Sequence, residues 1–317
     1  MKAVMFDRFG GIEVAQWREI PAPQPTANEV QMHIAYTAVN PVDWKIREGW
    51  LKHMLEHEFP IIPGWDASGT ITAMGDDAAK FKIGDEVYAY CRTPVVHWGT
   101  YAEYICLPEN LVALKPAACS FAKAAAIPLA ALTARQALFD AAKLRKGESV
   151  LIHGGAGGVG SLAIGFAHHA KATIYTTARK ANHDYVKTLG ADVAIDYDAE
   201  DFVEQIKSRE PEGVDVVIDC VGEDTLKQSY AVVKKGGRLV SIVNKIDQEK
   251  CKEAGIVGTF VLVEPSGDQL KHIARLIDRG DVAVPHIEEM PISAFAKAWQ
   301  KSREGHTRGK IALRIGD

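Results

Sequence analysis

The sequence contains no long apolar run and no secretory signal. Its apolar stretches fall short of the roughly 20 residues that a membrane-spanning helix needs, and charged residues occur within its first seven positions. We therefore expect a cytoplasmic protein. Positive charge is not in surplus either. The net charge is −4 at pH 7, which argues against nucleic acid or an anionic membrane as a partner.

Cysteine is scarce and scattered. No two of the five cysteines form a Cys-x-x-Cys pair, and their number is odd, so we predict neither a zinc ribbon nor a disulfide framework. Isolated cysteines suit a reducing compartment, where they pack as small apolar side chains. The five positions are Cys91, Cys106, Cys119, Cys220 and Cys251.

The length predicts more than one domain, because 317 residues exceed the size at which a single core stops growing, about 250–300 residues. In the first quarter apolar and polar residues alternate, as at Val30, Met32 and Ile34, and proline or glycine separates the short apolar pieces. This pattern is typical of a compact β-rich domain of barrel type.

From about residue 120 the pattern changes. An alanine-rich helix is predicted over 121–139, with one interruption at Pro128. Beyond it, nearly continuous apolar strands alternate with helices, which indicates a parallel sheet covered on both faces, that is, an α/β doubly wound fold. The predicted strands are 150–153, 172–177, 193–196, 214–220, 238–243 and 259–263.

A glycine-rich turn follows the first of these strands. The pattern Gly155-x-Gly157-x-x-Gly160 matches the dinucleotide-binding fingerprint of a Rossmann domain. The first glycine permits a sharp turn, the second lets the backbone approach a pyrophosphate, and the third lets the helix pack on its strand. Alone, the pattern also fits a tight turn without a ligand; its place after the first strand favours a nucleotide site.

The end of the second strand indicates which nucleotide binds. NAD sites carry a carboxylate there for the ribose 2′-hydroxyl, whereas NADP sites carry small residues and a cation for the 2′-phosphate. Here the strand ends in Thr177-Ala178-Arg179-Lys180, without a carboxylate and with two cations. We predict NADP(H) over NAD(H); the alternative is that the two cations only begin a solvated helix.

The last fifty residues depart from the alternating pattern. Helices are predicted over 269–278 and 294–301 and a strand over 309–315, which has no place in a completed six-stranded sheet. We expect this strand to rejoin the N-terminal domain. The predicted domains are therefore 1–122 completed by 266–317, and a Rossmann NADP-binding domain over 123–265.

Nearly the whole chain resembles the medium-chain dehydrogenase/reductases, and within them the zinc-independent quinone oxidoreductases. The resemblance rests on the glycine turn and on motifs outside it. It implies a GroES-like β-barrel catalytic domain, a cleft between the domains where the nicotinamide meets the substrate, and a homodimer. The motifs are Asn40-Pro41-Val42-Asp43, Pro63-Gly64-Trp65-Asp66-Ala67-Ser68-Gly69, Phe81-x-x-Gly84-Asp85-x-Val87, Gly99-Thr100-Tyr101-Ala102-Glu103-Tyr104, Leu132-Thr133-Ala134 and Gly309-Lys310-Ile311-Ala312-Leu313.

The chain departs from the zinc alcohol dehydrogenases of this superfamily. Gly64-Trp65-Asp66 stands where they carry Gly-His-Glu, and tryptophan does not ligate a metal. We therefore expect no metal, and hydride transfer from NADPH to a quinone or an α,β-unsaturated carbonyl without zinc. A metal-dependent alcohol dehydrogenase is a rival hypothesis. The related enoyl reductases carry a Tyr that acts as a general acid, and the stretch 45–51 here contains none. Because no proton donor is evident, a non-catalytic NADPH-binding redox sensor or structural protein is the alternative.

The resemblance implies contacts along the whole cofactor. These are Asn40, Thr133, Phe260, Val261 and Val263 at the nicotinamide end; Gly155, Gly157, Gly158 and Val159 at the pyrophosphate turn; Ala178, Arg179 and Lys180 at the adenosine 2′-phosphate, with Tyr197 close by; Val221, Val243 and Asn244 after the fourth and fifth strands; and Lys310 at the phosphates.

The candidates for substrate binding and catalysis lie in the N-terminal domain: Asn40, Asp43, Trp44, Trp50, Trp65 and Asp66. Each tryptophan serves domain packing equally well, and for Asp43 and Asp66 structural hydrogen bonds are the favoured interpretation over proton transfer. The histidines of His53-x-x-x-His57 have metal-ligand spacing, but a surface pair is the better interpretation.

Overall fold

The computed structural model describes residues 1–316, which form two compact units. Unit 1 comprises Met1–Leu129, Glu264–Asp278 and the segment from His286, and unit 2 comprises Ala130–Val263 and Arg279–Pro285. The division expected from the sequence differs from this one at three places. Residues 123–129 and 264–265 lie with unit 1, and residues 279–285 lie with unit 2.

Unit 2 is built on six parallel strands in the order β12-β11-β10-β13-β14-β15, which is the 3-2-1-4-5-6 order of the Rossmann fold. The predicted doubly wound sheet is confirmed. The strands are β10 (Ser149–Ile152), β11 (Thr173–Thr177), β12 (Val193–Ile195), β13 (Val214–Asp219), β14 (Val233–Ser241) and β15 (Val257–Phe260).

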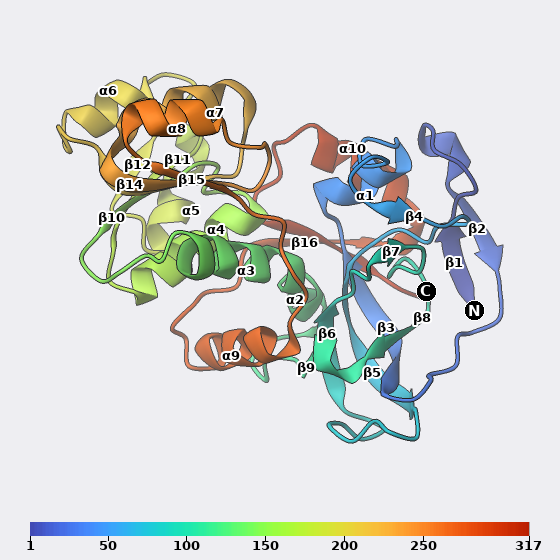
Figure 1. Cartoon of the computed structure of the whole chain (residues 1–317). Coiled ribbons are helices and arrows are strands. Elements are labelled where there is room, and N and C mark those ends of the chain that lie inside the picture. Colours follow the sequence, from blue (N-terminus) through green and yellow to red (C-terminus); the bar gives the residue numbers. More distant parts are fainter. Residues whose placement is uncertain (317) are drawn as a thin grey trace. The chain divides into compact units, whose positions relative to one another are not determined.

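Helices cover both faces of this sheet. Helices α4 and α5 lie on one face and α6, α7 and α8 on the other (Figure 1). The second face is apolar, because Phe202, Ile206, Leu226 and Cys251 of its helices form one buried cluster with the strands. The helices are α4 (Gly158–His169), α5 (His183–Thr188), α6 (Phe202–Lys207), α7 (Glu223–Ser229) and α8 (Gln248–Ala254).

Three predicted boundaries need correction. The strand expected over 238–243 begins at Val233 and ends at Ser241. The helix expected over 121–139 is three pieces, because Pro128 begins a new helix: α2 (Phe121–Ala125), α3 (Pro128–Arg135) and a π-helical segment over Gln136–Ala141. The strand expected over 259–263 begins two residues earlier and ends at Phe260. Gly258 conceals its start, since glycine is not typical of strands.

Unit 1 contains a seven-stranded sheet in the order β16-β17-β3-β5-β6-β9, with β8 also on β3. Its pairs are antiparallel except for β16 with β17. Its strands are β3 (Glu29–Ala38), β5 (Asp66–Met74), β6 (Glu86–Tyr90), β8 (Tyr104–Pro108), β9 (Val112–Leu114), β16 (Ile287–Pro291) and β17 (Lys310–Arg314). The remaining elements of unit 1 are the pairs β1 (Lys2–Met5) with β2 (Gln16–Glu19) and β4 (Glu56–His57) with β7 (Val95–Val96), and the helices α1 (Pro41–Arg47), α9 (Gly267–Asp278) and α10 (Phe295–Arg303).

The pairing of β3 with two antiparallel neighbours creates one polar edge in unit 1. Ala38, the last residue of β3, pairs with Asp66 at the start of β5 and with Ala312 near the start of β17. Asn40, which follows β3 after Val39, therefore meets the first residues of β5 and β17. This edge brings together Asn40, Asp66 and Lys310, which lie far apart in the sequence.

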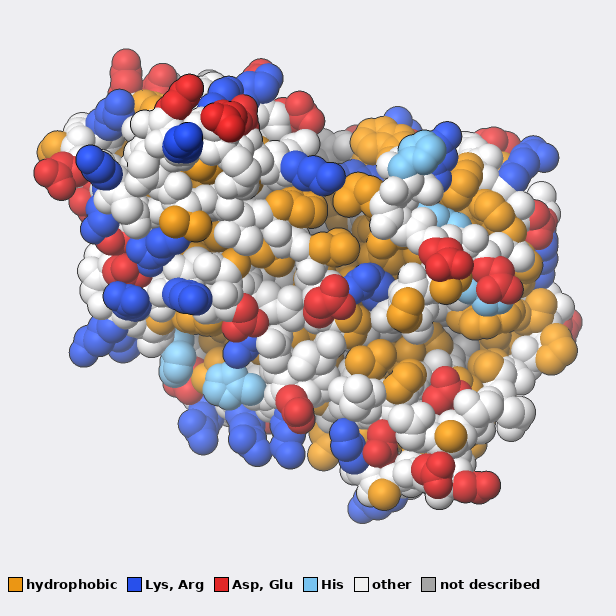
Figure 2. Space-filling view, in the orientation of Figure 1, with side chains coloured by type: hydrophobic (Ala, Val, Ile, Leu, Met, Phe, Trp, Pro, Cys, Tyr) orange, Lys and Arg blue, Asp and Glu red, His pale blue; other side chains and the backbone are white. Residues whose placement is uncertain are grey.

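The surface agrees with the small net charge. On the face shown in Figure 2, acidic and basic side chains are intermixed over α6, α7 and α8 rather than gathered by sign. Among the helices formed by residues 1–316, none has the length and apolar character that crossing a membrane requires.

Candidate functional site

The glycine turn between β10 and α4 forms a cradle with room for a phosphate group. Side chains at Gly155 or Gly160 would overlap Thr176 Oγ1 or the Gly154 carbonyl. Gly157 is different: its backbone is extended, and a Cβ there would meet only the Gly154 oxygen, at 3.3 Å. Helix α4 starts at the next residue, so its unpaired N–H groups lie at the turn. The turn therefore fits a pyrophosphate.

A buried histidine holds this turn in place. His153 Nδ1 lies 3.2 Å from Thr177 Oγ1, and its Nε2 lies 3.1 Å from Ser229 Oγ. The same threonine oxygen accepts a hydrogen bond from the Gly154 N–H at 3.1 Å. Burial lowers the pKa of His153 to about 4, so the ring is neutral at pH 7. Sequence reasoning missed His153, although a polar residue ending an apolar strand was a usable signal.

Asp219 and Ser241 shape the loops after β13 and β14. Asp219 Oδ1 accepts hydrogen bonds from the N–H groups of Val221 and Gly222 at 3.0 and 2.8 Å, and its Oδ2 accepts one from Ser241 Oγ at 2.7 Å. Ser241 Oγ accepts hydrogen bonds from the N–H groups of the predicted cofactor residues Val243 and Asn244 at 3.2 and 3.1 Å. Asp219 and Ser241 are both buried, and no sequence motif pointed to either residue.

The predicted 2′-phosphate residues lie together at the ends of β11 and β12. The guanidinium carbon of Arg179 lies 5.9 Å from the centroid of the Tyr197 ring. Ala178 is buried, and Lys180 is exposed at the start of a short 3-10 helix. The structure also brings in a residue that the sequence analysis missed: Asp198 Oδ2 lies 3.0 Å from Arg179 Nε.

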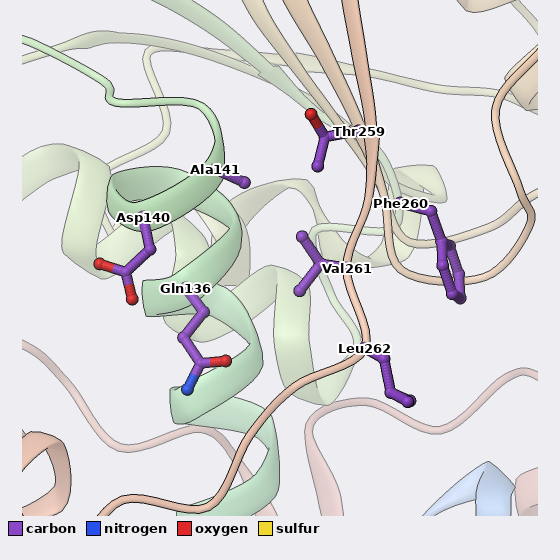
Figure 3. Close-up of a pocket in the computed structure, with 7 residues that line it drawn as sticks. All are labelled: Gln136, Asp140, Ala141, Thr259, Phe260, Val261 and Leu262. Carbon is purple, nitrogen blue, oxygen red and sulfur yellow. The ribbon is translucent and has the colours of Figure 1, made fainter. Parts of the chain in front are cut away.

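A hollow of about 340 Å³ lies in unit 2 where the segment 259–262 faces the π-helical segment. In Figure 3, Thr259 and Val261 point toward that helix, whereas Phe260 and Leu262 point away from it. Neighbouring residues of an extended chain alternate in this way. Phe260 and Val261, both expected at the nicotinamide end, thus point to opposite sides of this segment. The other two nicotinamide candidates of unit 2, Thr133 and Val263, are buried.

Asn40, Asp66 and Lys310 form a buried polar cluster in unit 1. Asn40 Nδ2 donates to Asp66 Oδ2 at 2.8 Å, and Asn40 Oδ1 accepts from Lys310 Nζ. Lys310 Nζ also lies 3.2 Å from Asp66 Oδ2 and donates to the Val39 carbonyl at 3.0 Å. The other Asp66 oxygen accepts from the Leu129 N–H at 2.7 Å. Both ends of the Asn40 amide are thus occupied within unit 1.

Lys310 is paired with the fully buried Asp66, and its own side chain is 6% exposed. The role at the cofactor phosphates that the resemblance implies for Lys310 stays a prediction. Burial raises the pKa of Asp66, and the charge of Lys310 acts against that rise. The Lys310 ammonium compensates the negative charge of the buried Asp66 carboxylate, which explains why the lysine side chain is buried.

Asp43 is a second buried carboxyl beside this cluster. Its Oδ2 accepts hydrogen bonds from the Asn40 N–H at 2.8 Å and from the Tyr101 hydroxyl at 3.3 Å, and that hydroxyl accepts one from Trp299 Nε1 at 2.9 Å. Within residues 1–316, its Oδ1 has no hydrogen-bond partner. Burial raises the pKa of Asp43 to about 7, so this carboxyl can hold a proton at neutral pH.

The three candidate tryptophans differ in exposure. Trp44 is buried, donates to Ser302 Oγ at 3.4 Å and packs edge-on against Trp50 at 5.4 Å. Trp65 is buried against Tyr90, with ring centroids 6.0 Å apart. Trp50 is 58% exposed. Packing explains the first two, and only Trp50 of the three presents a large apolar surface to solvent.

No cluster of three or more His, Cys, Asp or Glu side chains with metal-binding geometry occurs within residues 1–316. His57 lies in β4 and not on a helix, so the helical spacing of His53 and His57 does not place them on one face. Trp65 directly precedes β5, at the position where the zinc enzymes carry histidine.

Comparison with known proteins gives matches over both halves of the chain. The family model of the alcohol dehydrogenase GroES-like domain matches residues 26–117, and that of the zinc-binding dehydrogenases matches residues 189–313. The chain is 33% identical over 322 residues to the chloroplastic NADPH-dependent alkenal/one oxidoreductase of Arabidopsis thaliana, covering 99% of this chain and 79% of that protein.

Two solved structures are similar over their full lengths. Quinone oxidoreductase from Coxiella burnetii superposes with a TM-score of 0.89 at 34% identity, covering 100% of this chain and 99% of the other. Escherichia coli quinone oxidoreductase complexed with NADPH has a TM-score of 0.89 at 26% identity, covering 99% and 100%.

Proposed function

Because this chain belongs to the medium-chain dehydrogenase/reductases of the quinone oxidoreductase type, we propose that it is an NADPH-dependent reductase of quinones or α,β-unsaturated carbonyls. A relative of this chain reduces alkenals and alkenones with NADPH according to its name, and a similar structure holds NADPH. When bound, NADPH supplies the hydride, and the protein supplies binding and orientation.

The glycine cradle is the observation that carries this proposal. Gly157 leaves the backbone open to a pyrophosphate, and the start of α4 offers N–H groups to it. Arg179 and Lys180 supply positive charge for a 2′-phosphate at the end of β11. His153, Asp219 and Ser241 fix the loops that surround these groups.

We propose that the reaction proceeds without zinc. Trp65 replaces the histidine ligand of the zinc enzymes and packs against Tyr90. Without a Lewis acid to ionise an alcohol, an acceptor that is already electrophilic is the better substrate. Quinones fit better than enones, since the oxygens of a reduced quinone take protons from water, whereas an enone carbon needs a placed proton donor. Asp43, whose pKa burial raises to about 7, can hold a proton at neutral pH, but it is buried.

The test measures NADPH oxidation by the full chain against ortho- and para-quinones, enals and enones, with and without a strong chelator. We expect turnover with quinones, a preference for NADPH over NADH, and no effect of the chelator. Tight NADPH binding with no turnover on any acceptor would instead favour a redox sensor or structural protein. Stoichiometric zinc by elemental analysis would favour a metal-dependent alcohol dehydrogenase.

We also propose that the chain is a homodimer formed along β15. This strand is an edge of the unit 2 sheet, and edge strands present backbone groups to a partner. Val257 in β15 and Leu262, two residues beyond its end, are 60% and 44% exposed, so this edge and the segment after it present apolar side chains. Light scattering should give twice the mass of the chain, and Val257→Lys should give a monomer; a monomeric wild type would exclude the dimer.

A cytoplasmic location is the remaining proposal, and it rests on the five isolated free cysteines, which suit a reducing compartment. The plant relative described above is chloroplastic by name. Imaging of the full chain with a fluorescent tag at its C-terminus distinguishes the two locations, and fluorescence confined to an organelle would contradict the proposal.

A further inference from the structure

The cation predicted to bind the 2′-phosphate already has an anionic neighbour. Strands β11 and β12 are parallel and adjacent, with Thr177 opposite Ile195, so the loops that follow them leave the same edge of the sheet. Asp198 Oδ2 lies 3.0 Å from Arg179 Nε, and the Tyr197 ring lies against the same guanidinium. A carboxylate is therefore present beside Arg179. It comes from Asp198 in the loop after β12, and not from the end of β11.

The loop holds Asp198 in this position. The Asp198 N–H donates to Asp196 Oδ1 at 3.2 Å, and the Asp196 N–H donates to Glu200 Oε2 at 2.8 Å. These bonds close a tight turn directly after β12. Asp198 is thus a fixed part of the surroundings of Arg179, although its side chain is exposed to solvent.

A carboxylate at this place affects the two cofactors differently. A phosphate monoester carries about −1.5 to −2 charges at pH 7, so it is repelled by Asp198 and must share Arg179 with it. NADH has an uncharged 2′-hydroxyl at the same position. A carboxylate does not repel this hydroxyl and can accept a hydrogen bond from it.

We propose that Asp198 is a specificity-determining residue, which weakens the selection of NADPH over NADH by competing with the 2′-phosphate for Arg179. This inference rests on the proposed function, in which Arg179 receives that phosphate. The competition is between exposed groups, so its effect is moderate. Exposed ion pairs of this kind change equilibria by up to about fivefold.

The experiment compares cofactor binding by the wild type, Asp198→Asn, Arg179→Ala and the double variant. Dissociation constants for NADPH and NADH are measured by fluorescence titration of the full chain without an acceptor. Asp198→Asn should tighten NADPH binding about two- to fivefold and leave NADH binding nearly unchanged. The gain should shrink at high salt and should be absent in the Arg179→Ala background.

The matched control is Asp184→Asn, which removes one exposed negative charge from α5 in the same unit. It should leave the ratio of the two affinities unchanged. Weaker or unchanged NADPH binding in Asp198→Asn would overturn the proposal, as would an equal gain for NADH or an equal gain without Arg179. If the wild type binds no NADPH, the proposed function itself fails, which is a different result.

Discussion

Lys310→Met should lower the free energy of unfolding by about 3–5 kcal/mol, the loss that follows when one partner of a buried ion pair is removed. Lys310 Nζ lies 3.2 Å from Asp66 Oδ2, and the two side chains are 6% and 0% exposed. The substitution keeps most of the aliphatic volume but leaves the carboxylate in a low-dielectric environment without a counter-charge. The measurement is the urea midpoint of unfolding at pH 7.

The pH dependence of the free energy of unfolding distinguishes the loss of charge compensation from a simple loss of packing. Without Lys310, the folded-state pKa of Asp66 rises further above its ordinary value of 3.8, so the folded state binds more protons than the unfolded state. The difference in the free energy of unfolding between the wild type and Lys310→Met should therefore shrink as the pH falls toward 3.8, because protonation of Asp66 removes the buried charge. A deficit that stays constant with pH would show that packing, not charge, is lost.

Two further variants complete the comparison. Adding Asp66→Asn to Lys310→Met should recover part of the stability, since it removes the uncompensated charge and keeps an acceptor for the Leu129 N–H. Lys301→Met breaks the partly exposed pair with Glu288 and should cost about 1 kcal/mol or less. The proposed role of the pair is wrong if Lys310→Met is no more damaging than Lys301→Met.

The lysine also shows where sequence reasoning ends. The periodicity of unit 2 revealed its six strands and the glycine turn, because alternation of strand and helix is a local pattern. Lys310 and Asp66 are 244 residues apart, and their contact depends on β3 having β5 and β17 as its neighbours. No spacing rule connects such positions, so the pairing of Lys310 with Asp66 could not be predicted from the sequence.

Asp198 shows the same limit within one domain. The second strand itself leads to Arg179-Lys180, without a carboxylate. The acid comes from the loop after the next strand, which lies beside β11 only because the sheet is parallel and β12 is its neighbour. The burial of Trp44 and Trp65 was also beyond prediction, since the tryptophan side chain suits a pocket and a core equally.

Gly157→Ala should abolish most NADPH binding without unfolding the protein. Its backbone is extended, and the added methyl group would meet only the Gly154 oxygen, at 3.3 Å, so the fold can accept it with a small shift of that carbonyl. The methyl group would occupy the space that a pyrophosphate needs. Loss of one hydrogen bond to a charged phosphate costs about 1.5–3 kcal/mol, so the dissociation constant should rise about 10- to 150-fold.

Gly160→Ala is the contrasting variant on the same turn. Alanine suits a helix better than glycine, by about 1 kcal/mol, but a Cβ at this position would overlap the Gly154 carbonyl and force the turn away from α4. Overpacking of this kind costs about 1–3 kcal/mol or more. We therefore expect Gly160→Ala to lose stability and cofactor affinity together, whereas Gly157→Ala loses affinity alone.

Thermal unfolding with and without NADPH separates the two outcomes: the cofactor should raise the melting temperature of the wild type but not of Gly157→Ala. Normal NADPH affinity in Gly157→Ala would mean that the pyrophosphate does not bind at this turn.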